Sequence, residues 1–283
     1  MRYSDNEPPQ ASPFGERKAE ILKMAGRDKL IMLIAEDNED VRNYLKKGFE
    51  NDFEVYAYDN GADALANVKE VNPDLIISDV MMPGINGMEL CNRLKADIDT
   101  SHIPLILLTA RSQAIFKVEG LESGADDYIT KPFNFSVIAA RVWNLIEGRH
   151  KLRLRYQKEI KLDPQNITIN NLDEAFLTKV LKYVENHIAD PDLSVEQLSQ
   201  ELAMSKSAFY KKIKSLTNQT GVEFIRTIRV KRAAQLLTQG QLTVSQVAYE
   251  VGFMDVDYFR KCFKEHFNYT PKEHPVQGSA ETI

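Results

Sequence analysis

The sequence predicts two domains, an α/β domain with a five-stranded parallel sheet followed by an all-α domain with two helix-turn-helix units. Five short runs rich in Ile, Leu and Val lie between residues 29 and 130, and segments of helical period separate them. This alternation is typical of a parallel sheet covered by helices on both faces. Beyond Asp173 the strand signals end, and a helical segment that begins at Leu193 recurs from Leu242. The repeat predicts two similar helical units.

We expect the chain to divide into five segments. At 283 residues it is long enough for two domains, since compact units commonly run about 100 to 200 residues. Proline and polar residues mark the expected linkers. The segments are a linker or terminal segment at 1–28, the α/β domain at 29–148, an interdomain linker at 149–172, the all-α domain at 173–275 and a tail at 276–283.

In the α/β domain each expected strand is a short apolar run, and each expected helix has apolar residues at helical spacing. The expected strands are KLIMLIA (29–35), FEVYAY (53–58), DLIISD (74–79), IPLILLTA (103–110) and DDYIT (126–130). The expected helices are 40–49, 61–71, 87–96, 113–123 and 133–148.

The all-α domain contains an internal repeat. Residues 193–214 match residues 242–264 at an offset of 49, which becomes 50 after one inserted residue. Each copy opens with a capping box, whose side chains satisfy the first free backbone amides of a helix; the pairs are Ser194 with Gln197 and Thr243 with Gln246. Each copy therefore predicts a helix, a short turn and a second helix.

The net charge of −5 conceals an asymmetry between the two halves of the chain. Residues 28–147 hold 21 acids against 11 bases, whereas residues 148–283 hold 20 bases against 16 acids. An acidic half and a basic half indicate different partners. The basic half is a candidate for binding nucleic acid.

Composition also excludes some classes of protein. The longest apolar runs fall far short of the roughly 20 residues that a membrane helix needs, and the amino terminus lacks the apolar core of a secretory signal. We therefore expect this segment to lie in the cytoplasm and outside the membrane. Cys91 and Cys262 lie far apart without the partners of a zinc or redox motif, and they are expected to be buried apolar residues.

Polar side chains follow four of the expected strands. They are Glu36 and Asp37 after the first strand, Asp79 after the third, Thr109 after the fourth and Lys131 after the fifth. Because the carboxyl ends of parallel strands meet at one edge of the sheet, we expect these side chains to share a pocket. Crowded carboxylates repel one another unless a cation lies among them, and hard oxygen ligands suit Mg²⁺. A metal beside such a carboxylate supports phosphoryl transfer.

The motifs at these strand ends resemble the receiver domain of bacterial response regulators. The motifs are AEDNED (35–40), LIISDVMMPGINGMEL (75–90), LLTA (107–110) and YITKPF (128–133), and the resemblance covers about residues 29–147. It implies a flavodoxin-like fold in which Asp79 is the phosphoacceptor. It also implies that Mg²⁺ is held by Glu36, Asp37, Asp79 and the backbone carbonyl of Met81.

The same resemblance implies roles for three further residues. Lys131 would contact the phosphoryl group, and the peptide bond from Lys131 to Pro132 would be cis. Thr109 and Tyr128 would be the switch pair, in which the hydroxyl turns toward the phosphate and the ring moves inward. The simpler alternatives are that Asp79 caps a strand, that residues 36–39 cap the following helix, and that Tyr128 is an ordinary half-buried tyrosine.

The second domain resembles the AraC/XylS-type DNA-binding domain over about residues 173–274. The resemblance rests on both helix-turn-helix copies, on VGF (251–253) and on the aromatic block that begins at Tyr258. By this match the second helix of each copy, at about 205–216 and 255–266, enters the major groove. The residues expected to face bases or phosphates are Lys206, Ser207, Tyr210, Lys211, Val256, Asp257, Arg260 and Lys261.

Further side chains of this domain have expected positions. Lys212 is expected near phosphates, and the helix that joins the copies is expected to expose Arg226, Arg229, Lys231 and Arg232. The aromatic and apolar residues expected on the core face are Phe209, Ile213, Phe259 and Phe263. The alternative for each outward residue is a solvated helix surface.

The sequence departs from the AraC/XylS pattern at two places. Asp255 and Asp257 place negative charge at the start of the second recognition helix, where they favour the helix dipole, repel phosphate and could accept from a cytosine amino group. His274 and Pro275 stand where the family has an aromatic and a basic residue. We expect the last helix to be short.

Together the two resemblances imply a phosphorylation-dependent transcriptional regulator without enzymatic turnover, most like the carboxyl-terminal portion of a hybrid two-component regulator. The sequence shows no phosphoacceptor-histidine segment and no Gly-rich ATP-binding boxes. The implied partners are promoter DNA, a histidine kinase, RNA polymerase and, on activation, a second copy of the chain. A complete hybrid protein would be anchored in the inner membrane, and its targets would be genes of carbohydrate use.

Two rival functions remain open at this point. A magnesium-dependent phosphohydrolase would also use an aspartate nucleophile, but Asp79 is followed by Val, Met, Met and Pro, without the second acid that such an enzyme needs. A constitutive DNA-binding module with a purely structural receiver is the other rival.

Overall fold

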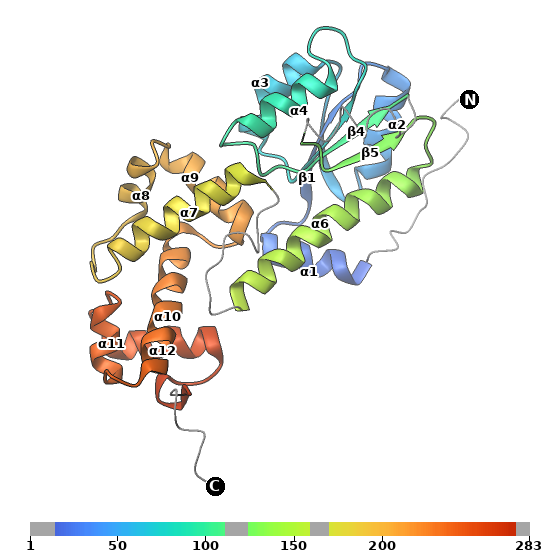
Figure 1. Cartoon of the computed structure of the whole chain (residues 1–283). Coiled ribbons are helices and arrows are strands. Elements are labelled where there is room, and N and C mark those ends of the chain that lie inside the picture. The colour runs from blue at the N-terminus through green and yellow to red at the C-terminus, as the bar shows by residue number, and fades with distance from the viewer. Residues whose placement is uncertain (1–14, 111–123, 159–169, 276–283) are drawn as a thin grey trace. The chain divides into compact units, whose positions relative to one another are not determined.

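The structure is a computed structural model that describes residues 15–110, 124–158 and 170–275. It divides the chain into two compact units, Met1–Lys151 and Leu152–Ile283 (Figure 1). The expected helix at 113–123, most of the expected linker and the expected tail lie outside the described residues.

The first unit is built on a five-stranded parallel sheet, as the sequence predicts. The strand order is β2-β1-β3-β4-β5, so the direction of winding reverses between β1 and β3. The strands are β1 (Leu30–Ala35), β2 (Phe53–Tyr58), β3 (Leu75–Asp79), β4 (Leu105–Thr109) and β5 (Asp127–Thr130). Every residue of β3 and β4 is buried, which explains why these strands appear in the sequence as continuous apolar runs.

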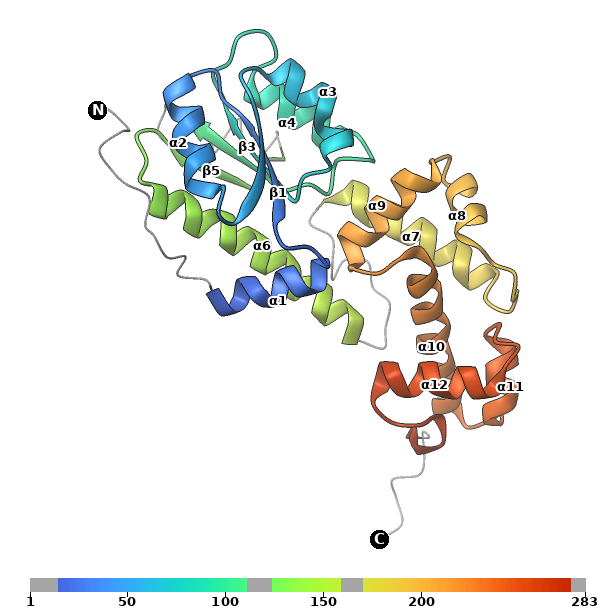
Figure 2. The same cartoon turned by 180° about the vertical axis from the view of Figure 1, so that it is seen from behind.

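Helices cover both faces of this sheet (Figures 1 and 2). On one face α2 (Glu39–Phe49) and α6 (Phe135–Lys158) pack against Met32 and Ile34 of β1. On the other face α3 (Gly61–Val71) and α4 (Gly87–Ala96) form the second core cluster with β3 and β4. Cys91 is buried in that cluster, as expected.

Two helices of the first unit differ from the expected boundaries. The helix α1 (Gly15–Ala25) lies in the segment that was expected to be a linker, and its Ile21 joins the core with Leu30 and Trp143. The helix α6 continues through Gly148 to Lys158. Arg149 and His150 explain this continuation, because the first forms an ion pair with Asp126 and the second is buried.

The second unit is all-α, as predicted, with its two helix-turn-helix copies joined by one long helix. Its elements are α7 (Asn171–Asn186), α8 (Val195–Glu201), α9 (Lys206–Thr217), α10 (Gly221–Gln239), α11 (Val244–Glu250), α12 (Val256–Phe267) and the 3₁₀ turn η3 (Pro271–Glu273). Both predicted capping boxes are present, at the starts of α8 and α11. None of the helices in the described ranges combines the length and apolarity that a bilayer span requires.

The two copies turn at corresponding residues that differ in type. Ala203 follows α8 with a φ of 52°, and Gly252 follows α11 with a φ of 78°. This left-handed region favours glycine, because a Cβ is crowded there. A Cβ on Gly252 would also lie 2.5 Å from the carbonyl oxygen of Ile188. The second turn therefore requires glycine, whereas the first accommodates alanine.

Candidate functional site

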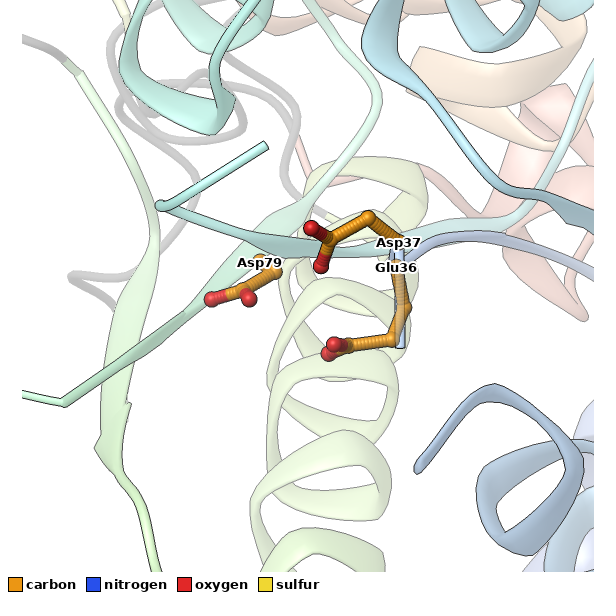
Figure 3. Close-up of side chains that lie close together, drawn as sticks. All are labelled: Glu36, Asp37 and Asp79. Carbon is orange, nitrogen blue, oxygen red and sulfur yellow. The ribbon is translucent and has the colours of Figure 1, made fainter. Parts of the chain in front are cut away.

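Three carboxylates meet at the carboxyl edge of the sheet, where the winding reverses. Glu36 and Asp37 follow β1, and Asp79 ends the neighbouring strand β3. One side-chain oxygen from each residue lies within 4.8 Å of the other two (Figure 3). Glu36 and Asp79 are buried, whereas Asp37 is exposed. The predicted cluster of carboxylates is thus present, and Asp37 is its solvent-exposed member.

Lys131 brings a positive charge into this cluster from the end of β5. Its Nζ lies 2.9 Å and 2.7 Å from the two carboxylate oxygens of Glu36 and 2.8 Å from Oδ2 of Asp79. One ammonium therefore contacts two carboxylates that lie on neighbouring strands. The peptide bond between Lys131 and Pro132 is cis, as expected.

The environment shifts the pKa of both Glu36 and Lys131. Burial and the nearby Asp79 charge raise the pKa of Glu36 to about 7, against the opposing effect of Lys131. Burial disfavours the ammonium form of Lys131, but its hydrogen bonds to Asp79 and Glu36 outweigh burial and raise its pKa. The three acids hold more negative charge than one lysine can balance.

Backbone contacts that the sequence did not predict hold the cluster in place. Arg42 donates from Nη1 to the carbonyl oxygens of Glu36 at 2.7 Å and Asp37 at 3.1 Å. Asn38 caps α2 by accepting from the backbone N–H of Val41. The sequence signal for this role of Arg42 is its position four residues after Asn38, the residue that caps the helix behind the acids.

The turn after Asp79 requires a glycine at position 87. A Cβ there would lie 2.1 Å from the carbonyl oxygen of Asp79. The N–H of Gly87 donates to the carbonyl of Val80 at 3.1 Å, and Asn86 caps α4. The segment that follows the carboxylate is therefore folded back tightly beside it.

The other predicted receiver residues lie at or near the same edge. Thr109 is buried at the end of β4, and its carbonyl oxygen accepts from the N–H of Lys131 at 2.7 Å. Tyr128 lies in β5 opposite Leu107 and packs, partly buried, against the second core cluster. Met81, which follows β3, is 69% exposed.

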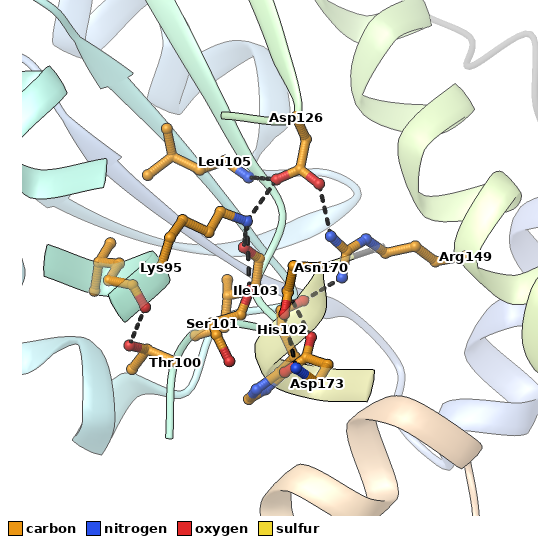
Figure 4. Close-up of polar contacts among 11 residues, drawn as sticks. Lys95, Thr100, Ser101, His102, Ile103, Leu105, Asp126, Arg149, Asn170 and Asp173 are labelled. Carbon is orange, nitrogen blue, oxygen red and sulfur yellow. Dashed lines mark hydrogen bonds and ion pairs between the residues drawn. The ribbon is translucent and has the colours of Figure 1, made fainter. Parts of the chain in front are cut away.

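A separate buried network lies at the start of β4 and β5, at the opposite edge of the sheet (Figure 4). Asp126 accepts from Lys95 at 2.7 Å, from Arg149 at 2.7 Å and from the N–H of Leu105 at 2.8 Å. Burial raises the pKa of Asp126, but Arg149 and Lys95 outweigh burial and hold it below its usual value. Every oxygen of this carboxylate is satisfied, so the network stabilises the fold.

In the second unit α9 and α12 begin within one residue of the predicted recognition helices. Phe209, Ile213, Phe259 and Phe263 are all fully buried, as predicted. Most of the proposed DNA-facing residues lie on the outer sides of these helices, but Val256 packs against the core of the second copy. Lys206, Ser207, Tyr210, Asp257, Arg260 and Lys261 are exposed, and Lys211 and Val256 are half-buried.

Four basic residues do not lie where the sequence predicts them. Lys212 is buried and forms an ion pair with Asp173 at 2.6 Å, so its expected place near phosphates is wrong. Lys231 is fully buried, and Arg226 and Arg229 are partly buried, which contradicts their expected exposure. Arg232 is exposed, as expected. Arg229 donates to the backbone carbonyls of Asp190 and Gly252. These hydrogen bonds stabilise the turn between α11 and α12.

A groove of about 740 Å³ lies between the two helix-turn-helix copies. The starts of both recognition helices line it with Lys206, Tyr210 and Tyr258, and α10 contributes Arg226. The guanidinium of Arg226 donates to the hydroxyl of Tyr258 at 3.3 Å. Basic and aromatic groups thus lie between the two proposed reading helices.

The carboxyl-terminal departure from the family pattern has a structural role. The expected short last helix is the 3₁₀ turn η3. After it, His274 is buried and hydrogen-bonded to Thr238 and Tyr269, at 2.9 Å and 3.0 Å. His274 therefore closes the core of the second copy.

Comparison with known proteins shows similarity to two families. A family model described as the response regulator receiver domain matches residues 32–143, and one described as a helix-turn-helix domain matches residues 198–274. Histidine kinase P4 of Formosa agariphila is 44% identical over 255 residues, which are 90% of this chain and 19% of that protein.

Two shorter matches each cover about two fifths of the chain. The transcriptional regulatory protein CseB of Streptomyces coelicolor is 40% identical over 116 residues, which are 41% of this chain and 48% of CseB. The signal receiver domain of a histidine kinase from Syntrophus aciditrophicus, a solved structure, is 41% identical with a TM-score of 0.40, and the match covers 42% of this chain and 91% of that one. The chain thus spans less than half the length of the two curated relatives.

Proposed function

Since this chain is a two-component response regulator that joins a receiver domain to an AraC-type helix-turn-helix domain, we propose that phosphorylation of Asp79 controls its binding to promoter DNA. In this proposal the chain accepts a phosphoryl group and turns over no substrate of its own. The phosphoryl donor is a histidine kinase, either a separate protein or another part of the same polypeptide.

The observation that carries the proposal is the contact of Lys131 with two carboxylates at the reversal point of the sheet. Asp79 is 6% exposed, and its Oδ2 lies 2.8 Å from the ammonium of Lys131. A carboxylate that merely capped a strand would not need a partly buried lysine from the end of β5 and two further acids from the end of β1. Such a set of groups supports transfer of an anionic group to Asp79.

The transfer step follows from these positions. A carboxylate oxygen of Asp79 attacks phosphorus, a P–O bond forms, and the P–N bond of the donor phosphohistidine breaks. The imidazole leaves with the electron pair of that bond. Lys131 lies where its charge can pair with the transferred oxygens.

The donor atoms of the cluster fit Mg²⁺. Glu36, Asp37 and Asp79 offer hard carboxylate oxygens close to one another, and the exposed Asp37 leaves room for water or phosphate oxygens. When bound, Mg²⁺ would neutralise charge on the transferring group. Met81 would add its backbone carbonyl to this set.

We propose further that Thr109 and Tyr128 carry the change away from Asp79. Thr109 is buried at the end of β4, directly beside the strand that ends in Asp79. Tyr128 is partly buried on β5 and packs against the second core cluster, and in this proposal its ring moves further inward. The surface that would change includes residues 113–123, which lie outside the described residues.

The second domain is the proposed output. Phosphorylation would favour dimerisation or release of this domain, and the bound regulator would recruit RNA polymerase. The basic residues on the outer sides of α9 and α12 support contact with DNA. Genes of carbohydrate use are proposed as targets on the family resemblance alone, and mapping of bound DNA across the genome, with and without Asp79, would identify them.

Labelling with acetyl phosphate and Mg²⁺ tests the phosphoacceptor. We expect the wild-type chain to take up one phosphoryl group and the Asp79→Ala variant to take up none. Asp59→Ala is the matched control, because Asp59 is an exposed acid that follows β2 at the same edge of the sheet; this variant should label normally.

Three results would contradict the proposal in different ways. Equal labelling of wild type and Asp79→Ala would place the phosphoacceptor elsewhere, and steady release of phosphate without retained label would favour a phosphohydrolase. Equal DNA affinity of labelled wild type and Asp79→Ala would favour a constitutive DNA-binding module.

A further inference from the structure

Arg260 differs in type from every other basic residue on the two recognition helices. The basic residues of α9 and the remaining ones of α12 are lysines, apart from His266. Lysine presents a point charge, whereas the planar guanidinium of arginine presents parallel N–H donors. In the major groove that geometry matches the O6 and N7 acceptors of guanine.

The position of Arg260 suits contact with a base. Phe259 and Phe263 turn into the core and are fully buried, so the neighbouring Arg260 lies on the outer side of α12, with its side chain 46% exposed. It is the fifth residue of the helix, and the amino-terminal part of a recognition helix is the part that reaches base edges.

An acid one turn earlier holds the guanidinium of Arg260. Its Nη1 donates to Oδ1 of Asp257 at 2.7 Å. Within the described residues, Nε and Nη2 of Arg260 make no hydrogen bond. The donor pair Nε and Nη2 thus stays available, while Nη1 is held by Asp257.

We propose that Arg260 reads a guanine and that Asp257 is a positioning residue that orients Arg260 for this contact. The assignment rests on the proposed DNA-binding function of this chain and names one base that it selects. An oriented guanidinium loses less side-chain entropy on binding than a free one. Asp257 thus acts through Arg260, because its carboxylate already accepts from that side chain.

Selection from a random duplex DNA library tests this assignment in the full chain, treated with acetyl phosphate and Mg²⁺. We expect wild type to yield a motif with a fixed G·C pair in one half. Arg260→Ala should lower the preference for guanine at that one pair by about 5- to 150-fold and leave the other pairs unchanged. Lys264→Ala, an exposed change one turn further along α12, should weaken binding without altering any base preference.

Asp257 needs its own pair of variants. Asp257→Ala should reduce the guanine preference by less than Arg260→Ala does, and Asp257→Glu should restore it, because a longer acid at the same spacing still reaches the guanidinium. Asp257→Ala also removes a favourable charge from the first turn of α12, so the base preferences are compared at a temperature where thermal unfolding shows every variant to be fully folded. This comparison separates orientation of Arg260 from stability of the helix.

The outcomes distinguish the two levels of the proposal. If wild type yields no motif, sequence-specific binding itself fails, and the guanine assignment fails with it. If wild type yields a motif and Arg260→Ala yields the same one, the guanine assignment alone is overturned. If Asp257→Ala keeps the full preference, Asp257 has no positioning role.

Discussion

Lys212 and Asp173 form an ion pair inside the helix-turn-helix domain. Their side chains are 1% and 2% exposed, and the Lys212 ammonium also lies 5.3 Å from the centre of the Phe176 ring. Breaking a buried ion pair by removing one partner is strongly destabilising, because the remaining charge stays buried without compensation. The pair ties α9 to α7 and thereby fixes the first recognition helix.

We expect Lys212→Met to lower the free energy of unfolding of the second domain by about 3–5 kcal/mol, because Asp173 would keep a buried negative charge. Urea unfolding followed by far-ultraviolet circular dichroism measures this loss. Trp143, the single tryptophan of the chain, is buried in the receiver domain, so its fluorescence reports the other domain in the same sample.

The control for this prediction is Lys206→Met. Lys206 forms an ion pair with Glu196 at the surface, and such pairs are worth about 1 kcal/mol or less. A loss of the same size in both variants would show that the buried pair contributes no more than a surface pair does.

The true position of Lys212 was accessible from spacing alone. Phe209, Lys212, Ile213 and Leu216 follow the helical period and are all buried, so spacing places Lys212 on the core face. The positive charge of Lys212 favours an exposed position, and one sequence does not identify Asp173 on α7 as its buried partner. Lys231, between Ile228 and Ala234 on the buried side of α10, repeats this error.

At the scale of an element, α12 contains a histidine that stays neutral in the folded state. Burial lowers the pKa of His266 to about 4, and the nearby Lys231 acts in the same direction. In the unfolded chain the pKa of histidine is about 6.5. Between these two values the unfolded chain binds more protons than the folded one, so stability falls as the pH falls.

We expect the second domain to lose about 1–2 kcal/mol of stability through His266 between pH 6.5 and pH 4, with allowance for its partial contact with solvent. Urea unfolding at a series of pH values measures this loss. His266→Leu should show a shallower dependence over the same window. Burial also lowers the pKa of His274, so some dependence should remain, and identical curves for both proteins would contradict the assignment to His266.

Elements with a clear period or a cap were predictable, and those held by distant partners were not. The strands follow from their apolar runs, and α8 and α11 start at their predicted capping boxes. The helix α1 was missed because its short apolar stripe is stabilised by Ile21 packing against β1 and α6. The end of α6 was missed because Gly148 resembles a helix stop, while Arg149 is anchored by Asp126 on the β5 side.

At the scale of the whole molecule, charge is divided between an acidic receiver and a basic output domain. The site in the receiver was predictable because its residues follow strand ends, and parallel topology brings strand ends to one edge. The supporting contacts of Arg42 and Gly87 were not, since backbone carbonyls leave no trace in a sequence. The same limit applies to Arg229, whose acceptors are the carbonyls of Asp190 and Gly252.

The charge of the output domain predicts a salt-dependent affinity for DNA. We expect Lys211→Ala combined with Lys261→Ala to weaken binding and to make the slope of log affinity against log salt shallower by about 2, because each lost phosphate contact releases one counterion fewer. Fluorescence anisotropy over a range of sodium chloride concentrations measures both quantities.

Lys179→Ala removes an exposed lysine of α7, outside both recognition helices, and it should leave the slope unchanged. An unchanged slope in the double variant would mean that these two lysines do not contact DNA.

The difference between Ala203 and Gly252 limits how the two copies can be exchanged. A cassette that transplanted the first copy into the place of the second would bring an alanine against the carbonyl of Ile188, and it would disturb the carbonyl that anchors Arg229. The reverse transplant meets no such obstacle at its turn, because glycine tolerates the conformation of Ala203. In an engineered chimera the first position therefore accepts the turn of either copy, whereas the second position accepts only a turn with glycine.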